Sequence, residues 1–333
     1  MKKKTQTFIL KKPVYIISSA SIAGKKEGVG PLKNYFDRVA EDDTMGENTF
    51  EKAEREMFYR TARAAARKAD KKLDELDLML SGDLTNQIVS SSYCASATKI
   101  PFIGIYSACA TFAGTLGLAA ALISGNLIDT CLCMSGSHFS TAERQYRYPL
   151  EFGNQRQTYS QWTVTGVGAS VLSGIGKGVY IDKVCFGKVI DFGVKDIANM
   201  GAAMAPAAMD TLCAFFDDTK TKPDDYDIIA TGDLGKLGSD ILIDLMKERG
   251  YELGQNYIDC GNMVYSSMED CMQGGSGAGC SALVFNSYFI KKLKEKTFKK
   301  MLLISTGALM STTTNQQGET IPCTAHLVEV VND

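Results

Sequence analysis

The feature that most limits the possible folds is an internal repeat of an apolar run followed by Gly-Asp-Leu. Residues 78–84 read Leu-Met-Leu-Ser-Gly-Asp-Leu, and residues 228–234 read Ile-Ile-Ala-Thr-Gly-Asp-Leu. A second pair of similar segments, 131–137 and 302–308, has a larger offset, so the later half carries an insertion between the two matches. A chain that repeats its elements in order is expected to fold into related units.

Apolar, strand-like runs alternate with helical patterns on both sides of Gly176. Such alternation predicts an α/β protein built from two pseudo-twofold related βαβαβ-type halves, residues 1–176 and 177–333. Ligands of such folds bind at the carboxyl ends of strands. We therefore expect the site where the predicted strands give way to Gly-Asp, Ala-Cys and Ser-His pairs.

Three local signals predict where helices begin. Asn48 is placed to cap a helix, with Glu51 as its capping-box partner three residues later. A second helix is expected over residues 204–216, with Pro206 in its first turn. A third, rich in alanine and leucine, is expected to carry Cys109 in its first turn and to end near Ser124.

Composition excludes several classes of protein. The net charge of −2 gives no reason to expect a nucleic-acid partner. No apolar run approaches the length of a membrane-spanning helix, so no transmembrane segment is expected. The ten cysteines include no Cys-x-x-Cys pair, which argues against a structural zinc site and for a reducing compartment. We expect neither a metal centre nor a cofactor.

Cys109 is the most reactive-looking residue of the chain. A strand-like run over residues 102–106 precedes it, and an apolar helix follows it. The dipole at a helix start favours a thiolate, and the unpaired N–H groups there favour a bound anion. Cys109 is therefore a candidate nucleophile or part of an anion seat. The alternative is a small apolar residue that packs a helix start.

Several long and unusual runs identify what the chain is similar to. They are residues 138–145 (His-Phe-Ser-Thr-Ala-Glu-Arg-Gln), 153–156 (Gly-Asn-Gln-Arg), 161–166 (Gln-Trp-Thr-Val-Thr-Gly), 199–208 (Asn-Met-Gly-Ala-Ala-Met-Ala-Pro-Ala-Ala) and 318–322 (Gly-Glu-Thr-Ile-Pro). Two similar halves with a cysteine at a helix start resemble the thiolase superfamily. Within it, these runs resemble the stage V sporulation protein AD family of endospore-forming bacteria.

The resemblance implies a thiolase-like fold with a layered αβαβα core. It implies a homodimer paired through the strand before Cys109. It also implies a binding protein for dipicolinic acid, with or without calcium, that supports uptake into the developing spore and release in germination. Its expected place is peripheral, on the cytoplasmic side of the spore inner membrane, with other stage V sporulation membrane proteins as partners.

Acyl transfer by thiolases needs a histidine from the second half. The sequence has only His138 and His326, and the turn after residues 228–230, where related condensing enzymes carry a histidine, reads Thr-Gly-Asp. Asn262 is a possible match to a second, asparagine-bearing position, but an amide cannot act as a base. The residues therefore favour a lapsed active site with no catalytic group.

Two other functions stay open at this point. The first is a transferase or condensing enzyme that acts on coenzyme A or acyl-carrier thioesters through Cys109. The second is a purely structural subunit that holds membrane partners through its surface.

The hypothesis of a dipicolinate site assigns roles to named residues. Backbone N–H groups at Cys109 and in the glycine-rich turn at Ser276 and Gly277 suit one carboxylate. Arginine side chains can bind the other carboxylate of dipicolinate. Side chains that donate hydrogen bonds can contact the edge of the ligand, and aspartates can coordinate a calcium ion bound with it. The candidates are Arg144, Arg147 and Arg156 as clamps, His138 and Gln161 as donors, and Asp83 or Asp233 toward the metal.

Each assignment has a structural alternative. His138 can cap a loop, and the arginines, with Tyr146 and Tyr148, can line a dimer interface. Asp83 and Asp233 can be turn residues that accept backbone N–H groups. The basic stretch 291–300 is better explained as a solvated helix end than as a membrane contact.

Overall fold

The computed structural model describes residues 5–146, 157–271 and 273–332. A large mixed sheet runs through it in the order β10-β9-β12-β13-β8-β1-β7-β5-β3-β4, with β2 added beside β1. A two-stranded sheet pairs β11 with β6. The strands are β1 (Thr7–Ala23), β2 (Arg38–Val39), β3 (Leu78–Gly82), β4 (Phe102–Gly104), β5 (Thr130–Ser137), β6 (Trp162–Thr163), β7 (Gly166–Ser173), β8 (Tyr180–Phe186), β9 (Ile228–Thr231), β10 (Tyr257–Asp259), β11 (Gly275–Ser276), β12 (Lys300–Ala308) and β13 (Cys323–Val331).

The strand order shows the repeat in three dimensions. The series β4-β3-β5-β7-β1 in one part of the sheet is matched by β10-β9-β12-β13-β8 in the other. β1 and β8 are the strands of each series that come earliest in the chain. They pair antiparallel, with Thr7 opposite Cys185 and Tyr15 opposite Tyr180. The two series therefore meet at the β1–β8 pair, as expected for two units related by a pseudo-twofold axis.

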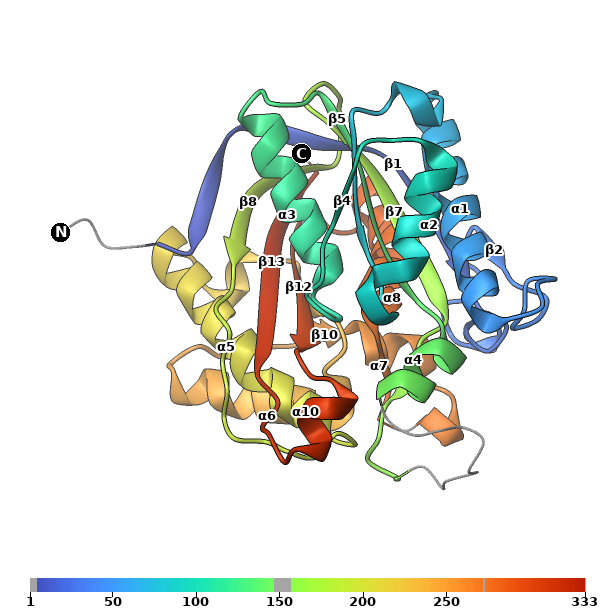
Figure 1. Ribbon diagram of the computed structural model, residues 1–333. Coiled ribbons are helices and arrows are strands. Elements are labelled where there is room, and N and C mark those ends of the chain that lie inside the picture. The colour runs from blue at the N-terminus through green and yellow to red at the C-terminus, as the bar shows by residue number, and fades with distance from the viewer. Residues whose placement is uncertain (1–4, 147–156, 272, 333) are drawn as a thin grey trace.

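Helices complete the layers. They are α1 (Phe50–Lys68), α2 (Val89–Thr98), α3 (Thr111–Ser124), α4 (Phe139–Tyr146), α5 (Met200–Thr219), α6 (Gly235–Glu248), α7 (Cys260–Tyr265), α8 (Ala278–Val284), α9 (Ile290–Lys294) and α10 (Thr312–Gln316). In Figure 1, α1 and α2 lie on one flank, α5 and α6 on the other, and α3 in the centre.

The central helices α3 and α8 carry the core between the two halves. α3 contacts β5 and β3 of the first series and β13 and β12 of the second, while α8 packs on β5, β7 and α3. Both helices are apolar on nearly every side, as buried helices are. This confirms the predicted layered α/β architecture with two related halves.

The insertion predicted from the unequal offsets lies between β10 and α8. The chain there forms α7, a short 3-10 turn over Glu269–Cys271, and β11. In the first half the chain passes from β4 to α3 without such elements. Because α3 and α8 hold matching places, Cys109 and Ser276 each lie two residues before a helix start.

Three helix starts differ from the predictions. Thr49, not Asn48, caps α1, because its extended backbone lets its hydroxyl accept the N–H of Lys52 at 3.3 Å. α5 begins at Met200 behind the cap Asn199, so Pro206 lies inside the helix, where its missing N–H removes one backbone hydrogen bond. α3 begins at Thr111, so Cys109 lies in the turn before the helix.

Candidate functional site

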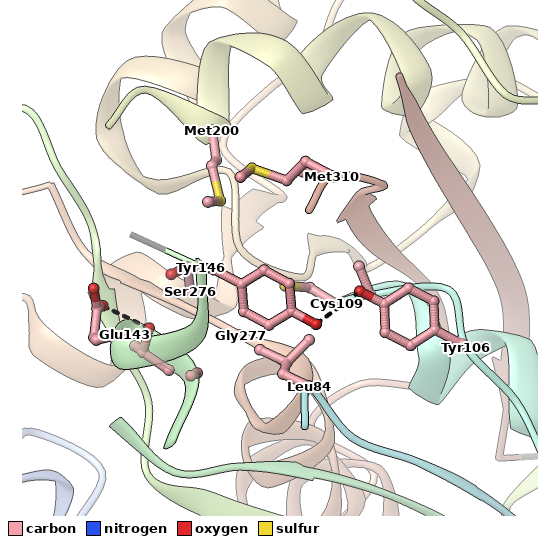
Figure 2. Close-up of a pocket in the computed structure, with 13 residues that line it drawn as sticks. Leu84, Tyr106, Cys109, Glu143, Tyr146, Met200, Ser276, Gly277 and Met310 are labelled. Atoms are coloured by element: carbon pink, nitrogen blue, oxygen red, sulfur yellow. Dashed lines mark hydrogen bonds between the residues drawn. The ribbon is translucent and has the colours of Figure 1, made fainter. Parts of the chain in front are cut away.

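A cavity opens beside Cys109 at the carboxyl ends of the strands. It holds about 410 Å³ of empty space, including the part open to solvent. Residues of both halves line it: Leu84, Tyr106, Ala108, Cys109, Ala142, Glu143, Tyr146, Thr163, Met200, Ser276, Gly277, Ala308 and Met310. Figure 2 shows the two methionines on one side of the Tyr106–Tyr146 pair and Leu84 on the other.

The turn that holds Cys109 has a strained backbone. Ala108 adopts a φ of 49°, a conformation that residues with a side chain rarely take. The hydrogen bonds that hold the turn include Ala110 N–H to the Ser107 carbonyl at 3.0 Å and the Thr111 hydroxyl to the Ala108 carbonyl at 2.7 Å. The turn presents Cys109, which is 8% exposed, to the cavity. Backbone strain of this kind is concentrated at ligand and active sites.

Gly307, near the end of β12, packs against the same turn. A Cβ atom built there would lie 2.2 Å from the Ser107 carbonyl oxygen and 2.9 Å from the Ala110 nitrogen. We expect Gly307→Ala to lower the free energy of unfolding by about 1–3 kcal/mol, because backbone atoms must shift. Urea unfolding measures the change. Gly254→Ala is the control, since its nearest neighbour would lie 3.5 Å away, and equal stability of both variants would contradict the prediction.

Asp233 is the buried acid beneath the cavity. Its carboxylate accepts the Thr306 hydroxyl at 2.6 Å and the Gly277 N–H at 3.0 Å. Burial raises the pKa of Asp233 to about 7, against the hydrogen bonds from Thr306, Cys109 and Gly277. The carboxylate repels a second negative charge, so it opposes formation of a thiolate at Cys109.

Neither histidine lines this cavity in the described part of the chain. The ring of His326 accepts the Gly187 N–H at Nδ1 (3.3 Å) and faces the Ser107 hydroxyl at 3.4 Å through Nε2. Burial lowers the pKa of His326 to about 4, so the ring is neutral at pH 7.

His138, a predicted ligand, serves the loops instead. Its Nε2 lies 2.8 Å from the Asp43 carbonyl oxygen, and its Nδ1 accepts the Ser140 N–H at 3.2 Å. Burial lowers the pKa of this ring too. The structure thus gives His138 the loop-bonding role that was its structural alternative.

The predicted ligand residues divide into three groups. Cys109, Ser276 and Gly277 line the cavity, and Asp233 lies directly beneath it. Gln161 supports the site, because its amide donates to the carbonyls of Asp233 at 2.7 Å and Gly275 at 2.8 Å. The third group is the candidate arginines, and Arg144, the one that lies within the described residues, does not line the cavity.

Arg144 pairs with Glu51 on the surface and does not line the cavity. Arg147 and Arg156 lie outside the described residues. The predicted anion site in the glycine-rich turn has fewer N–H groups to offer a ligand than expected. The N–H groups of Gly277 and Gly279 already donate, to Asp233 and to the Ser137 hydroxyl.

Two other candidates have structural roles. Asp83 accepts the N–H groups of Thr85 at 2.8 Å and Ser91 at 2.7 Å, and so holds the turn into α2. Asn262 lies at the start of α7, where its N–H donates to Asp259, and it lines a separate hollow with Lys236. Asn262 therefore does not line the Cys109 cavity, and Ser276 holds the place before α8 that Cys109 holds before α3.

Sequence reasoning missed most of the cavity wall. The Tyr106 and Tyr146 hydroxyls lie 3.1 Å apart, and Glu143 accepts the Thr163 hydroxyl at 2.7 Å. Tyr106 stands three residues before Cys109, and Glu143 belongs to the unusual run at residues 138–145, so a signal existed for both. Nothing in the sequence pointed to Met310 as part of the site.

Comparison with known proteins decides the family. The family model described as stage V sporulation protein AD (SpoVAD) matches residues 4–331. The chain belongs to the stage V sporulation protein AD family. One member, stage V sporulation protein AD of Bacillus subtilis (strain 168), is 41% identical over 321 residues, which cover 96% of this chain and 95% of the relative.

Solved structures place this SpoVAD-family chain in the thiolase-like fold. The 3-oxoacyl-[acyl-carrier-protein] synthase III of Aquifex aeolicus VF5 superposes with a TM-score of 0.58 at 14% identity, covering 96% of this chain and 99% of that one. The cerulenin-bound OleA of Xanthomonas campestris gives 0.60 at 12% identity, covering 99% and 100%. At this level of identity the likeness shows the fold alone.

Proposed function

We propose that the cavity beside Cys109 binds dipicolinic acid, or its calcium chelate, without catalysing a reaction. Through this binding the protein supports uptake of dipicolinic acid into the developing spore and its release in germination. The observation that carries the proposal is the make-up of the cavity. Apolar side chains and hydroxyl groups face the ligand space, and the turn in which related condensing enzymes carry a histidine has Asp233, which lies beneath the cavity, in its place.

The wall suits a flat aromatic ring with polar edges. Met200, Met310 and Leu84 provide apolar faces, and thioethers pack well against aromatic rings. The hydroxyls of Tyr106 and Tyr146, now bonded to each other, can turn to donate to a carboxylate. A pyridine ring with two carboxylates presents both kinds of surface.

Charge is the main constraint on this proposal. The described residues that line the cavity include the acid Glu143 but no lysine, arginine or histidine. A dianion therefore needs one of three aids: protonation of Asp233, a calcium ion that enters with it, or a clamp from Arg147 or Arg156. Isothermal titration with dipicolinate and with its calcium chelate tests the function. Absence of heat with both ligands would remove it.

A condensing enzyme is the second candidate, because the fold neighbours include a synthase and Cys109 keeps its place in the cavity. We expect no acyl group on Cys109 after incubation with acetoacetyl-coenzyme A, since no described histidine lines the cavity to stabilise a thiolate as its imidazolium partner. Transfer of the thiol proton to the Asp233 carboxylate would leave the thiolate without a neighbouring positive charge. General-base help is typically worth about 10²–10⁴-fold. Mass spectrometry of the intact protein, with Cys109→Ser as control, measures this. A Cys109 adduct that turns over would establish the enzyme.

The location and partners follow the same proposal. Among the described residues, no helix combines the length and the apolar composition needed to cross a membrane. We propose a peripheral position on the cytoplasmic side of the spore inner membrane, with other stage V sporulation membrane proteins as partners. A structural subunit without a ligand is the competing view, and it predicts that filling the cavity leaves dipicolinate loading of spores unchanged.

A second copy of the chain is the proposed partner for β4. This short strand ends the sheet, no described strand pairs with its outer edge, and Ile103 is 47% exposed. Such an edge can pair with the same strand of another molecule about a twofold axis. We expect a dimer by light scattering and a monomer for Ile103→Lys. Ile175→Lys, at an 87% exposed site away from β4, is the control, and a dimer in both variants would place the interface elsewhere.

A further inference from the structure

A second groove lies between α1 and the β1–β2 pair. Its lining shares no residue with the Cys109 cavity. Five of its lining residues are basic and one is acidic: Arg38, Arg60, Arg63, Arg67, Lys68 and Asp37. The whole chain carries a net charge of −2, so this positive charge is a local concentration.

The helix period places three of the arginines together. Arg60, Arg63 and Arg67 stand at positions i, i+3 and i+7 of α1, which share one face of a helix. The opposite face, with Ala62 and Ala65, is buried. β2 pairs with the end of β1, with Arg38 opposite Ile22, and so brings a fourth guanidinium to the groove.

Neighbouring carboxylates neutralise only part of this charge. Arg60 pairs with Glu56 at 2.6 Å, and Lys68 pairs with Asp37 at 2.6 Å. Within residues 5–146, 157–271 and 273–332, no ion pair is found for Arg38, Arg63 or Arg67. The guanidinium groups of Arg38, Arg63 and Arg67 thus line one groove with no carboxylate paired to them among the described residues, and Asp37 is the single acid in its lining. Arg63 also lies 5.7 Å from the centre of the Tyr59 ring.

The positive region extends beyond the groove. Burial lowers the pKa of Lys294, and the nearby Lys68 lowers it further. The amine of Lys294, on α9, therefore lies close enough to Lys68 to feel its charge, and the carboxylate of Asp37 partly offsets both. The dipole at the end of α1 accounts for basic residues at Arg67 and Lys68. It does not account for Arg38 or Arg63.

We propose that this groove binds phosphate groups, either of a soluble phosphate compound or of a phospholipid headgroup. A guanidinium presents two parallel N–H donors that match two phosphate oxygens, and arginine is favoured wherever such pairing matters. The groove combines a concave wall with guanidinium groups from two elements, which a surface of scattered lysines does not offer. The proposal does not depend on the dipicolinate cavity.

The test uses two probes with the full chain. Inorganic pyrophosphate is titrated calorimetrically, and vesicles of phosphatidylglycerol, with phosphatidylcholine as the neutral comparison, are sedimented with the protein. The variant is Arg63→Gln with Arg67→Gln, two exposed residues. The control is Lys236→Gln with Lys247→Gln, which removes the same charge from α6.

The groove variant should bind at least about tenfold more weakly than the wild type, while the control should match the wild type. Loss of pyrophosphate binding identifies a soluble ligand, and loss of vesicle binding alone identifies a lipid. Three results would overturn the proposal: no binding of either probe by the wild type, equal binding by the groove variant, or an equal loss in the control. Melting curves that match the wild type show that each variant is folded.

Discussion

Replacement of Cys109 by tryptophan should abolish dipicolinate binding. The indole would enter the space that the ligand needs, because Cys109 faces a cavity enclosed by Tyr106, Tyr146 and Met310. We expect affinity to fall by at least about a hundredfold, since a buried site cannot hold ring and indole together without large shifts. Calorimetric titration of the purified variant measures the loss.

The control for that experiment is Cys109→Ser. Serine keeps the space, so affinity should stay within about threefold if the thiol has no chemical role. Ala142→Phe narrows the same cavity from α4 and provides a second test if the tryptophan variant unfolds. If both Cys109→Trp and Ala142→Phe still bind dipicolinate, the ligand binds elsewhere in the protein. Binding lost equally with serine would give the sulfur itself a part in recognition.

The fold could be predicted because its main signal is periodic. The repeated Gly-Asp-Leu turns after apolar runs correspond to the ends of β3 and β9, which hold the same place in the two strand series. The exact residue at which a helix begins was harder to predict, since capping depends on the backbone conformation of one residue and adjacent residues can have equally suitable side chains. Thr49 and Asn48 are both good caps, and the structure places Thr49 at the cap, with its hydroxyl accepting the Lys52 N–H.

The site was predictable only where one segment supplies the residue. Cys109, Ser276 and Gly277 stand at turns before helices, which a sequence can show. Met310 reaches the cavity from a different part of the chain, and that approach depends on how the layers pack. The predicted role of Arg144 as a ligand clamp is not seen for a local reason: Glu51 on the neighbouring helix α1 forms an ion pair with it.

Dipicolinate should bind about tenfold more weakly at about pH 8.5 than at about pH 6, because Asp233 gains a negative charge in between. Burial raises the pKa of Asp233 to about 7, so the group is neutral below that pH and anionic above it. Both carboxyl groups of the ligand stay ionised throughout. The anionic ligand is therefore repelled only in the upper range, and affinity falls as the pH rises.

The matched variant is Asp233→Asn, which cannot ionise. Its amide oxygen can accept the Gly277 N–H, and its NH₂ group can donate to the Thr306 hydroxyl, so the turn keeps its hydrogen bonds. Affinity of this variant should be nearly constant over the same range. Titrations in buffers of different ionisation enthalpy should show proton uptake with the wild type near pH 7 and none with the variant. An unchanged slope in the variant would assign the effect to another group.

The calcium chelate separates charge from shape in this experiment. Calcium neutralises the two carboxylates of the ligand, so the chelate has no net charge for Asp233 to repel. Its affinity should therefore be less dependent on pH than that of dipicolinate, although both ligands present the same ring to Met200 and Met310. If the chelate loses affinity as steeply as the dianion, repulsion by Asp233 is not the cause, and a pH-dependent change in the shape of the cavity must be sought instead.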